Sequence, residues 1–325
     1  MLCLSGIILG APLARADVKA ASPEQPAAEG SADATAAQPA EPHRALTVVA
    51  LSRLTKFDMA AGTYTAEFEL LIKCEEAPCN PSPEASNGKF TAVESQQLDP
   101  LVKLFTVKAE LYADIDLSEF PFDRHTLPLS IQDKNEAYEY TYSPEFANQV
   151  LNELGTKSFV DPDVKLAGWA VGDTLEPRIV KRQVGKFEEE RLSFEVTIKR
   201  PLVASFFKTL VPVFFMIFVA GFMLLIKPKG ATGRLAAATG GLMTVVMFHL
   251  AATSSLPPLG YLTRMDKFMI ATYLVYLVNI LFAVGMVRFD EAKQEKRAEL
   301  AYLIAGGAVP GLALLGWLTV FLKIA

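Results

Sequence analysis

The stretch Arg234–Ser255 reads RLAAATGGLMTVVMFHLAATSS and differs from the other membrane-length segments of this chain. Ala, Gly, Thr and Ser make up much of it, whereas the other long segments are apolar throughout. Small and hydroxyl residues at membrane depth indicate either close helix packing or a water-filled path, and this segment alone leaves both open. On a helical period, one face is small at one end, bulky and apolar in the middle and hydroxylic at the other: Ala236, Gly240, Met243, Met247, Leu250 and Ser254.

Three further segments, at about 202–226, 268–287 and 300–322, are apolar and long enough to cross a bilayer. With 325 residues, 51% hydrophobic residues and a mean hydropathy of +0.27, the chain is too apolar for an ordinary soluble protein. We therefore predict a transmembrane domain at 201–325 with four helices, the second at 234–255. The net charge of -5 and the absence of a basic, aromatic-rich stretch give no indication of nucleic-acid binding.

Residues 45–200 instead show the pattern of short strands. Apolar and polar residues alternate in LTVVALSRL and again in TYTAEFELLIK, with a turn at 56–62 between them and a Pro- and Asn-containing loop at Glu75–Gly88. A helical turn is expected only at Glu145–Leu154. The remaining strand-like runs are FTVKAELYAD, LPLSI, AYEYTY, LAGWAV, PRIVKRQ and LSFEVTI. The predicted fold is thus an N-terminal all-β sandwich followed by a four-helix transmembrane bundle.

The beginning of the chain reads as an export signal. Leu2–Leu13 followed by Ala14-Arg15-Ala16 is typical of a signal-peptide core and cleavage site, so residues 1–16 are predicted to be a signal peptide. Its usual positively charged start is absent, which suggests that an upstream start codon is missing. Residues 17–44, which are rich in Ala, Pro, Glu and Ser, are predicted to be a disordered tether.

Removal of the signal peptide would leave two cysteines, Cys74 and Cys79. An even pair so close together in an exported domain favours a disulfide loop; a free pair or a metal site is the alternative, although no His lies nearby.

Charge in the loops predicts the orientation of the helices. Short connections after the first and third spans are rich in Lys and Arg, which favours the cytoplasmic side. The β domain and the C-terminus would then lie outside the cytoplasm, and the signal peptide requires the same topology.

Three local motifs occur in a fixed order. The first is DIDLSEFPFDRH at Asp114–His125, the second is Ile198-Lys199-Arg200-Pro201 with Pro212 beyond it, and the third is Leu256-Pro257 followed by Tyr261, Thr263 and Asp266. With the β sandwich and four helices, these motifs resemble the pentameric ligand-gated ion channels, the Cys-loop receptor superfamily, in its prokaryotic branch. The resemblance extends from about Ala45 to the C-terminus.

The resemblance implies a homopentamer in a bacterial inner membrane, with the β domain and C-terminus in the periplasm. An extracellular ligand or ion would open a central pore for small inorganic ions, and a small polar ligand, a proton or calcium would be the agonist. The second helix would line the pore, with apolar constrictions at Met243, Met247 and Leu250. The full predicted lining is Arg234, Ala236, Gly240, Met243, Met247, Leu250 and Ser254.

The resemblance also implies a gating interface at the membrane surface, in which Asp123 pairs with Arg200. The alternative is that both are ordinary solvated charges. The predicted interface comprises Phe57, Asp58, Phe120, Pro121, Phe122, Asp123, Arg200, Pro257 and Tyr261.

Agonist binding is expected between neighbouring subunits, at loops whose charges could equally be ordinary solvated surface charges. The candidate residues are Asp133, Glu136, Tyr138, Lys181, Arg182 and Glu188. Trp169 fits a structural role in a later strand.

A basic inner mouth at Thr232-Gly233-Arg234, with Lys227 and Lys229 close by, favours anion conduction or weak selectivity. The alternative is that Arg234 points away from the pore.

We do not expect an enzyme, a cofactor or a metal centre, because the sequence shows no nucleophile with its base, no phosphate loop and no metal-ligand cluster. The three histidines are scattered: His43 in the tether, His125 in the first motif, and His249 beside the lining face, where bonding to a neighbouring helix is favoured over pH sensing. The rival function is a membrane-anchored periplasmic sensor or binding protein that does not conduct.

Overall fold

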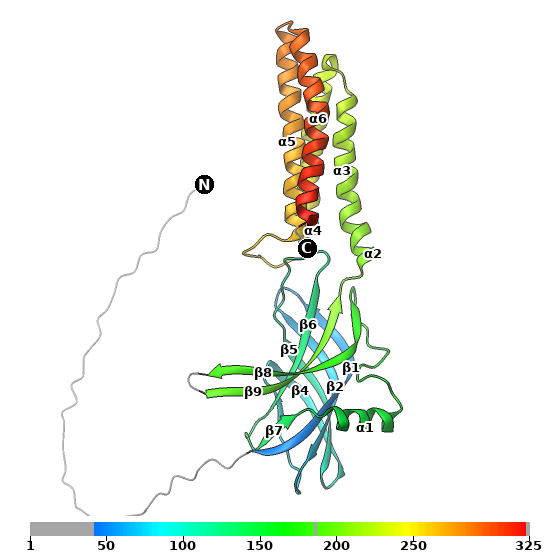
Figure 1. The fold of residues 1–325 in the computed structure, drawn as a ribbon, viewed down its shortest axis with the longest axis vertical. Coiled ribbons are helices and arrows are strands. Elements are labelled where there is room, and N and C mark those ends of the chain that lie inside the picture. Colours follow the sequence, from blue (N-terminus) through cyan, green and yellow to red (C-terminus); the bar gives the residue numbers. More distant parts are fainter. Residues whose placement is uncertain (1–41, 185–186, 323–325) are drawn as a thin grey trace, which may run out of the picture. The chain divides into compact units, whose positions relative to one another are not determined.

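The computed structural model describes residues 42–184 and 187–322 (Figure 1). The predicted signal peptide at 1–16 and the tether up to residue 41 lie outside the described residues. One correction falls at this boundary, because His43 and Arg44 belong to the first strand rather than to the tether. His43 pairs with Tyr138 in parallel register, so the sheet begins two residues earlier than the apolar pattern indicates.

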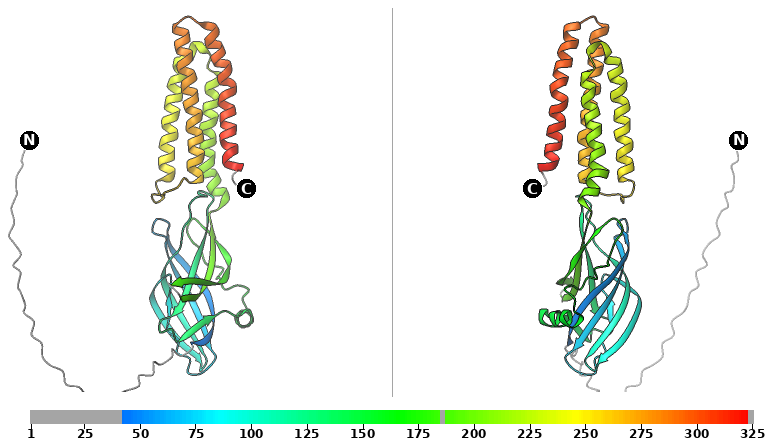
Figure 2. Two further views of the ribbon diagram at one scale, coloured as in Figure 1. Left: turned by 60° about the vertical axis from the view of Figure 1, so that its left-hand side comes forward. Right: turned by 90° about the vertical axis from the view of Figure 1, so that its right-hand side faces the viewer.

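The β-rich region forms two sheets (Figures 1 and 2). One contains β1 (His43–Asp58), β2 (Thr63–Cys74), β4 (Gly88–Asp99), β5 (Val102–Tyr112) and β7 (Tyr138–Thr141), in the order β4-β5-β2-β1-β7. The other contains β3 (Pro83–Ala85), β6 (Arg124–Asp133), β8 (Ala170–Val184) and β9 (Phe187–Lys199), in the order β3-β6-β9-β8. β3 lies within the segment predicted as a loop, since Pro83–Ala85 pairs with the end of β6.

The two sheets share one hydrophobic core, which confirms the predicted sandwich-like region. Successive side chains of β2 point to opposite faces of the sheet, and every second one is buried in the core. The buried residues include Tyr64, Ala66, Phe68, Leu70 and Ile72. The second sheet contributes buried residues from β6 and β9: Leu127, Leu129, Ile131, Leu192, Phe194, Val196 and Ile198. Inward faces from both sheets that pack together are the defining feature of a β sandwich.

A short helix, α1 (Pro144–Leu154), lies at the expected position. The Ser143 side chain accepts a hydrogen bond from the Phe146 backbone N–H, and Gly155 ends the helix with a left-handed φ of 67°. Phe146 and Val150 pack against Val48 of β1.

Four segments long and apolar enough to cross a membrane follow the sheets, and in Figures 1 and 2 they run side by side. The first combines α2 (Leu202–Ser205), a π-helical turn (Phe206–Leu210), α3 (Val211–Phe222) and a 3-10 turn (Met223–Leu225). A further 3-10 turn (Pro228–Gly230) leads into α4 (Ala231–Thr253), which is followed by α5 (Arg264–Glu291) and α6 (Glu295–Leu322).

The third and fourth helices begin four and five residues before the predicted spans at 268 and 300. Hydropathy detects only the apolar part of a helix, whereas charged first turns remain helical. At α5 the start is fixed by a capping box, in which Thr263 and Asp266 bond each other's backbone N–H groups.

We expect Leu129→Ala to lower the free energy of unfolding by about 2–5 kcal/mol, because it leaves a cavity between the sheets. Leu98→Ala is the matched control, since Leu98 is 53% exposed, and it should cost no more than about 0.5 kcal/mol. Denaturant unfolding of the full chain in detergent measures both. Equal losses from the two variants would contradict this assignment of the core.

Candidate functional site

The loop between β5 and β6 is bonded directly to the beginning of α5. The first backbone N–H groups of a helix lack partners within the helix. Here Arg264 N donates to Ser118 O (2.8 Å), and Met265 N donates to Phe120 O (3.1 Å). The Tyr261 hydroxyl accepts from Leu117 N (2.9 Å). Main-chain bonds thus join the β region to the third membrane-length helix.

Asp123 and Arg200 form the centre of this junction. Arg200 donates from Nε to Asp123 Oδ1 (2.6 Å), and its backbone N–H donates to Asp123 O (3.2 Å). The other carboxylate oxygen lies 2.7 Å from His125 Nε2. Asp123 and His125 are both buried, so the carboxylate depends on these partners for its solvation.

The Arg200 guanidinium is also enclosed by aromatic rings. It lies 4.5 Å from the Trp169 ring centroid and 5.1 Å from that of Phe120. Its Nη2 lies 2.9 Å from the sulfur of Met59, in the turn after β1. Because Arg200 stands between β9 and α2, one side chain links the β1 turn, the β5–β6 loop and the entry to the first membrane-length segment.

Of the other predicted interface residues, Phe120 contacts the Arg200 guanidinium and Phe57 contacts the rings of His125 and Trp169. Phe120 packs among apolar residues of the helices, including Leu210 and Phe268, and Phe122 packs against the same cluster. Pro121 follows Phe120 through a cis peptide bond. Phe57 lies edge-on to Trp169 at 5.3 Å, Asp58 accepts hydrogen bonds from Ala60 N and Ala61 N, and Pro257 lies in the connection between α4 and α5.

Charge around Asp123 sets its protonation. Burial acts to raise the pKa of the Asp123 carboxyl, but the hydrogen bond from His125 and the charge and hydrogen bond of Arg200 outweigh burial. The pKa therefore lies below its ordinary value, and the group is a carboxylate at neutral pH.

Most of the predicted lining face of α4 is exposed in the subunit. Met243, Met247 and Leu250 are 62%, 57% and 61% exposed, and Ala236, Gly240 and Ser254 are exposed as well. The opposite face is buried, with Ala238 and Val245 at 0% exposure.

Arg234 is a correction to the predicted lining. Its side chain is fully buried inside the subunit, where Nη2 donates to Asn279 Oδ1 of α5 at 3.0 Å. The guanidinium therefore does not share the exposed face of Met243 and Met247. The expectation of anion conduction based on Arg234 loses its support, while Lys227 and Lys229 remain exposed.

His249 connects α4 to α5, as the sequence favoured. Its Nε2 lies 2.7 Å from Asp266 Oδ1, and its Nδ1 lies 2.7 Å from the Tyr273 hydroxyl. The same Asp266 carboxylate closes the capping box at the start of α5. Asp266 therefore connects the start of α5, which is bonded to the β region, with His249 of α4.

Asp133 is a second correction, since it is buried and serves the fold. Its carboxylate accepts hydrogen bonds from Ser82 N (2.7 Å), Ala137 N (3.1 Å), Asn135 N (3.3 Å) and the Tyr140 hydroxyl (2.9 Å). With these four donors it holds the β6–β7 turn and has little capacity left for a ligand.

The other ligand-binding candidates are spread over two places. Glu136 is exposed with a left-handed φ of 54°, and Lys181 of β8 forms an ion pair with Glu190 of β9 (2.6 Å). Arg182 and Glu188 pair in the backbone register with Glu189 and Gln183, and their side chains lie outside what the structure describes.

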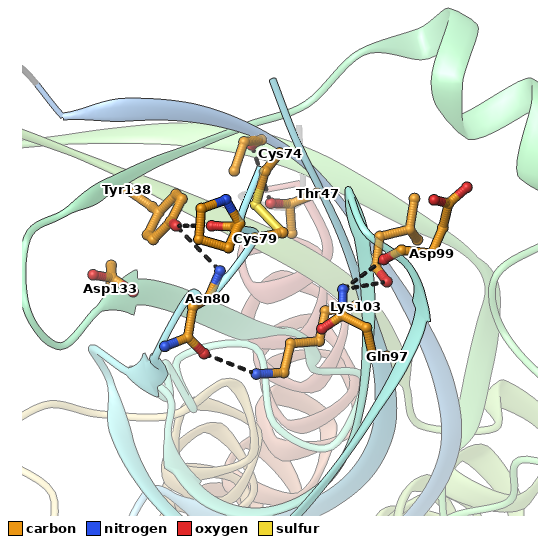
Figure 3. The surroundings of a disulfide bond; sticks show 12 residues. Thr47, Cys74, Cys79, Asn80, Gln97, Asp99, Lys103, Asp133 and Tyr138 are labelled. Carbon is orange, nitrogen blue, oxygen red and sulfur yellow. Dashed lines mark hydrogen bonds between the residues drawn. A yellow bond between two sulfur atoms is a disulfide. The ribbon is translucent and has the colours of Figure 1, made fainter. Parts of the chain in front are cut away.

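Tyr138 lies beside a disulfide between Cys74 and Cys79, whose Cα atoms are 5.5 Å apart (Figure 3). The Tyr138 hydroxyl accepts from Asn80 N (3.1 Å), and the Asn80 side chain accepts from Lys103 Nζ (3.2 Å). Since both sulfurs are used in the bond, neither cysteine is a free thiol or a metal ligand. In the described part of the chain, no group of three His, Cys, Asp or Glu is placed to hold a metal ion.

Comparison with protein-family models finds no match for this chain. What the structure establishes is a β-sandwich-like region at 43–199 followed by four helices suited to a membrane.

Arg200→Ala should destabilise the protein by about 3 kcal/mol, because it leaves the buried Asp123 carboxylate without its cation. Arg200→Lys should recover part of the loss, since it restores charge without the planar stacking on Trp169. Arg53→Ala is the control: its pair with Glu67 is largely exposed and should be worth less than about 1 kcal/mol. Thermal unfolding in detergent measures the stability of all three variants. Equal losses of stability would contradict the prediction.

Asp123 also predicts a pH dependence. A carboxyl whose pKa is lowered by folding stabilises fully above its unfolded pKa of about 3.9, and this stabilisation is lost as the pH falls through the folded pKa. The stability difference between the wild type and Asp123→Asn should therefore be constant near neutral pH and shrink below about pH 4. A difference that stays constant into that acidic range would show that the charge of Asp123 contributes nothing.

Proposed function

We propose that this protein is a homopentameric ligand-gated ion channel of a bacterial inner membrane, opened by a ligand or ion that binds its periplasmic β region. The observation that carries the proposal is the exposed face of α4. Gly240 and Ala236 give lipid little to contact, and a hydroxyl at Ser254 gains nothing from it. The same face is suited to a water-filled path.

A ring of identical subunits explains how such a face becomes enclosed. A head-to-tail contact between identical subunits closes into a ring when the rotation fits. Five α4 helices would then surround a central path, as the three sequence motifs also imply. Met243, Met247 and Leu250 would form apolar constrictions that close the path by excluding water, while Ala236 and Gly240 leave the inner end wide.

The junction provides a route from the β region to this path. Movement of the β5–β6 loop is transmitted to the start of α5 through the bonds from Arg264 N and Met265 N. Asp266, which directly follows Met265, contacts His249, and His249 adjoins the constriction residue Leu250. An agonist that favours one arrangement of the junction would thereby shift the population of open pores.

Three agonist classes fit the proposal: a small polar ligand, a proton or calcium. Asp133 is not among the residues that would bind the agonist, because its carboxylate is fully engaged within the subunit. Glu136 and Lys181 are exposed and remain candidates.

Current recording from the protein in planar bilayers tests the proposal. External pH and calcium are varied, and chloride is then replaced by a large anion. A gated current supports the channel, and its reversal potential assigns the permeant ion. A pentamer that is correctly inserted and silent under every condition would favour the non-conducting sensor.

Leu250→Ser should raise the current in the absence of agonist by at least about tenfold, because a hydroxyl lets water wet the constriction. Leu303→Ser is the matched control, since Leu303 is similarly exposed but lies on α6. It should leave the resting current unchanged. If the two variants gave the same resting current, α4 would not line the path.

A further inference from the structure

Met59 places a thioether against the ion pair that joins the β region to the helices. It lies in the turn between β1 and β2, and Arg200 Nη2 is 2.9 Å from its sulfur. The same guanidinium donates from Nε to Asp123 Oδ1 at 2.6 Å. The sulfur of a thioether is only a weak hydrogen-bond acceptor, so Met59 competes little with the carboxylate for the guanidinium.

Met59 also differs from the other methionines in its access to water. No other methionine occurs between residues 42 and 201, and Met59 is partly exposed. Met265 and Met269 of α5, by contrast, are fully buried among the helices. Oxidation of a sulfur-containing side chain follows its exposure, so an oxidant dissolved in water can reach Met59 while the helices stay packed.

The turn that carries Met59 is held in place from two directions. The Asp58 carboxylate accepts hydrogen bonds from two backbone N–H groups of the turn itself, at 2.9 and 3.2 Å. Gly62, the last residue of the turn, accepts through its carbonyl from Ala113 N at 2.8 Å. The turn therefore has little freedom to carry the sulfur away from Arg200.

Conversion of the thioether to a sulfoxide would change the competition for the guanidinium. Oxidation makes this flexible apolar side chain polar, and the new oxygen is a far better acceptor than sulfur. An N–H donor keeps an oxygen at about 2.7–3.2 Å, and the sulfur itself already lies 2.9 Å from Nη2. Because the turn is held, the guanidinium has to shift to admit the oxygen. Its bond to Asp123 is the one that this shift loosens.

We propose that Met59 is a reversible oxidation site whose sulfoxide weakens the ion pair of Asp123 and Arg200. The oxidant is a two-electron oxygen donor such as hydrogen peroxide. A lone pair of the sulfur attacks one peroxide oxygen, the O–O bond breaks, and the other oxygen leaves as water with the proton of the first. The sulfur loses the two electrons that the peroxide gains. This site is independent of whether the protein conducts ions.

The reverse step is a reduction by a methionine sulfoxide reductase. Two thiols supply two electrons and two protons, the sulfoxide oxygen leaves as water, and the thiols become a disulfide. The partial exposure of Met59 gives such an enzyme access to the sulfoxide.

Peptide mapping of the full-length protein tests where oxidation occurs. The protein in detergent is treated with hydrogen peroxide, and the sulfoxide at each methionine is quantified by mass spectrometry over time. Met59 should oxidise at least about tenfold faster than Met265 and Met269, because both of these are shielded from water. Subsequent treatment with methionine sulfoxide reductase and a dithiol should restore the thioether of Met59.

Thermal unfolding tests whether oxidation reaches the ion pair. Met243 and Met247 are exposed on α4 and are first replaced together by Leu, so that their oxidation does not contribute. In this background, peroxide should lower the thermal midpoint by about 2–4 °C, the shift expected when a hydrogen bond is lost. Met59→Leu is the matched control and should abolish the shift. Met59→Gln, whose amide oxygen stands in for the sulfoxide oxygen, should lower the midpoint without any oxidant.

A double-mutant comparison identifies the group through which Met59 acts. If the sulfoxide loosens the bond to Asp123, oxidation should cost less in a protein that lacks this carboxylate. The shift caused by peroxide should therefore fall to less than about half in Asp123→Asn, since two changes at one contact are not additive. Glu67→Gln, which alters an ion pair on β2 away from the junction, should leave the shift unchanged.

Three results would overturn the proposal. One is oxidation of Met59 no faster than that of Met265 and Met269. Another is the same peroxide shift in Met59→Leu, which would place its origin at another residue. The third is an undiminished shift in Asp123→Asn, which would show that the sulfoxide does not act on the ion pair.

Discussion

The structure depends on how the first turn of α5 obtains its hydrogen-bond partners. A helix start needs acceptors for its free N–H groups, and those of Arg264 and Met265 are supplied by carbonyls of the β5–β6 loop. The N–H groups of Asp266 and Thr263 obtain their acceptors from each other's side chains in the capping box. The β region is therefore part of the cap of a membrane helix, and the two cannot separate without leaving buried donors unpaired.

The ion pair of Asp123 and Arg200 reinforces this contact from a second direction. A buried ion pair gains little net stability unless its remaining groups are satisfied. Here His125 occupies the second carboxylate oxygen, and Trp169 and Phe120 enclose the guanidinium. Phe120 also supplies the carbonyl that accepts from Met265, so the electrostatic and main-chain contacts share one residue. Such sharing makes the junction cooperative, because a change at either contact moves the other.

The sequence predicted the strands and helices better than it predicted the contacts between them. Alternation identified the strands of the sandwich, and apolar length identified four helices, because both properties are local in the chain. The sequence singled out Asp123, Arg200 and Tyr261 but missed Ser118, Arg264 and Met265. Ser118 and Met265 act through backbone atoms, which carry no signal in residue type, whereas Arg264 also pairs its guanidinium with Glu119. Asp133 was misread for a related reason: in the sequence, a carboxylate at the end of a strand looks the same whether its oxygens face solvent or accept from four internal donors.

Arg234 shows where a usable signal was present in the sequence. At about 100° per residue, it lies roughly 180° from Met243 around the helix and close to Ala238, so the period itself places it on the buried face. A buried arginine that contacts Asn279 ties the N-terminal end of α4 to α5, while His249 ties its C-terminal end to Asp266. Two polar contacts at opposite ends of one helix fix its rotation about its own axis. That rotation decides which residues face outward, so the exposed row from Ala236 to Ser254 is a consequence of these two contacts as much as of the small residues themselves.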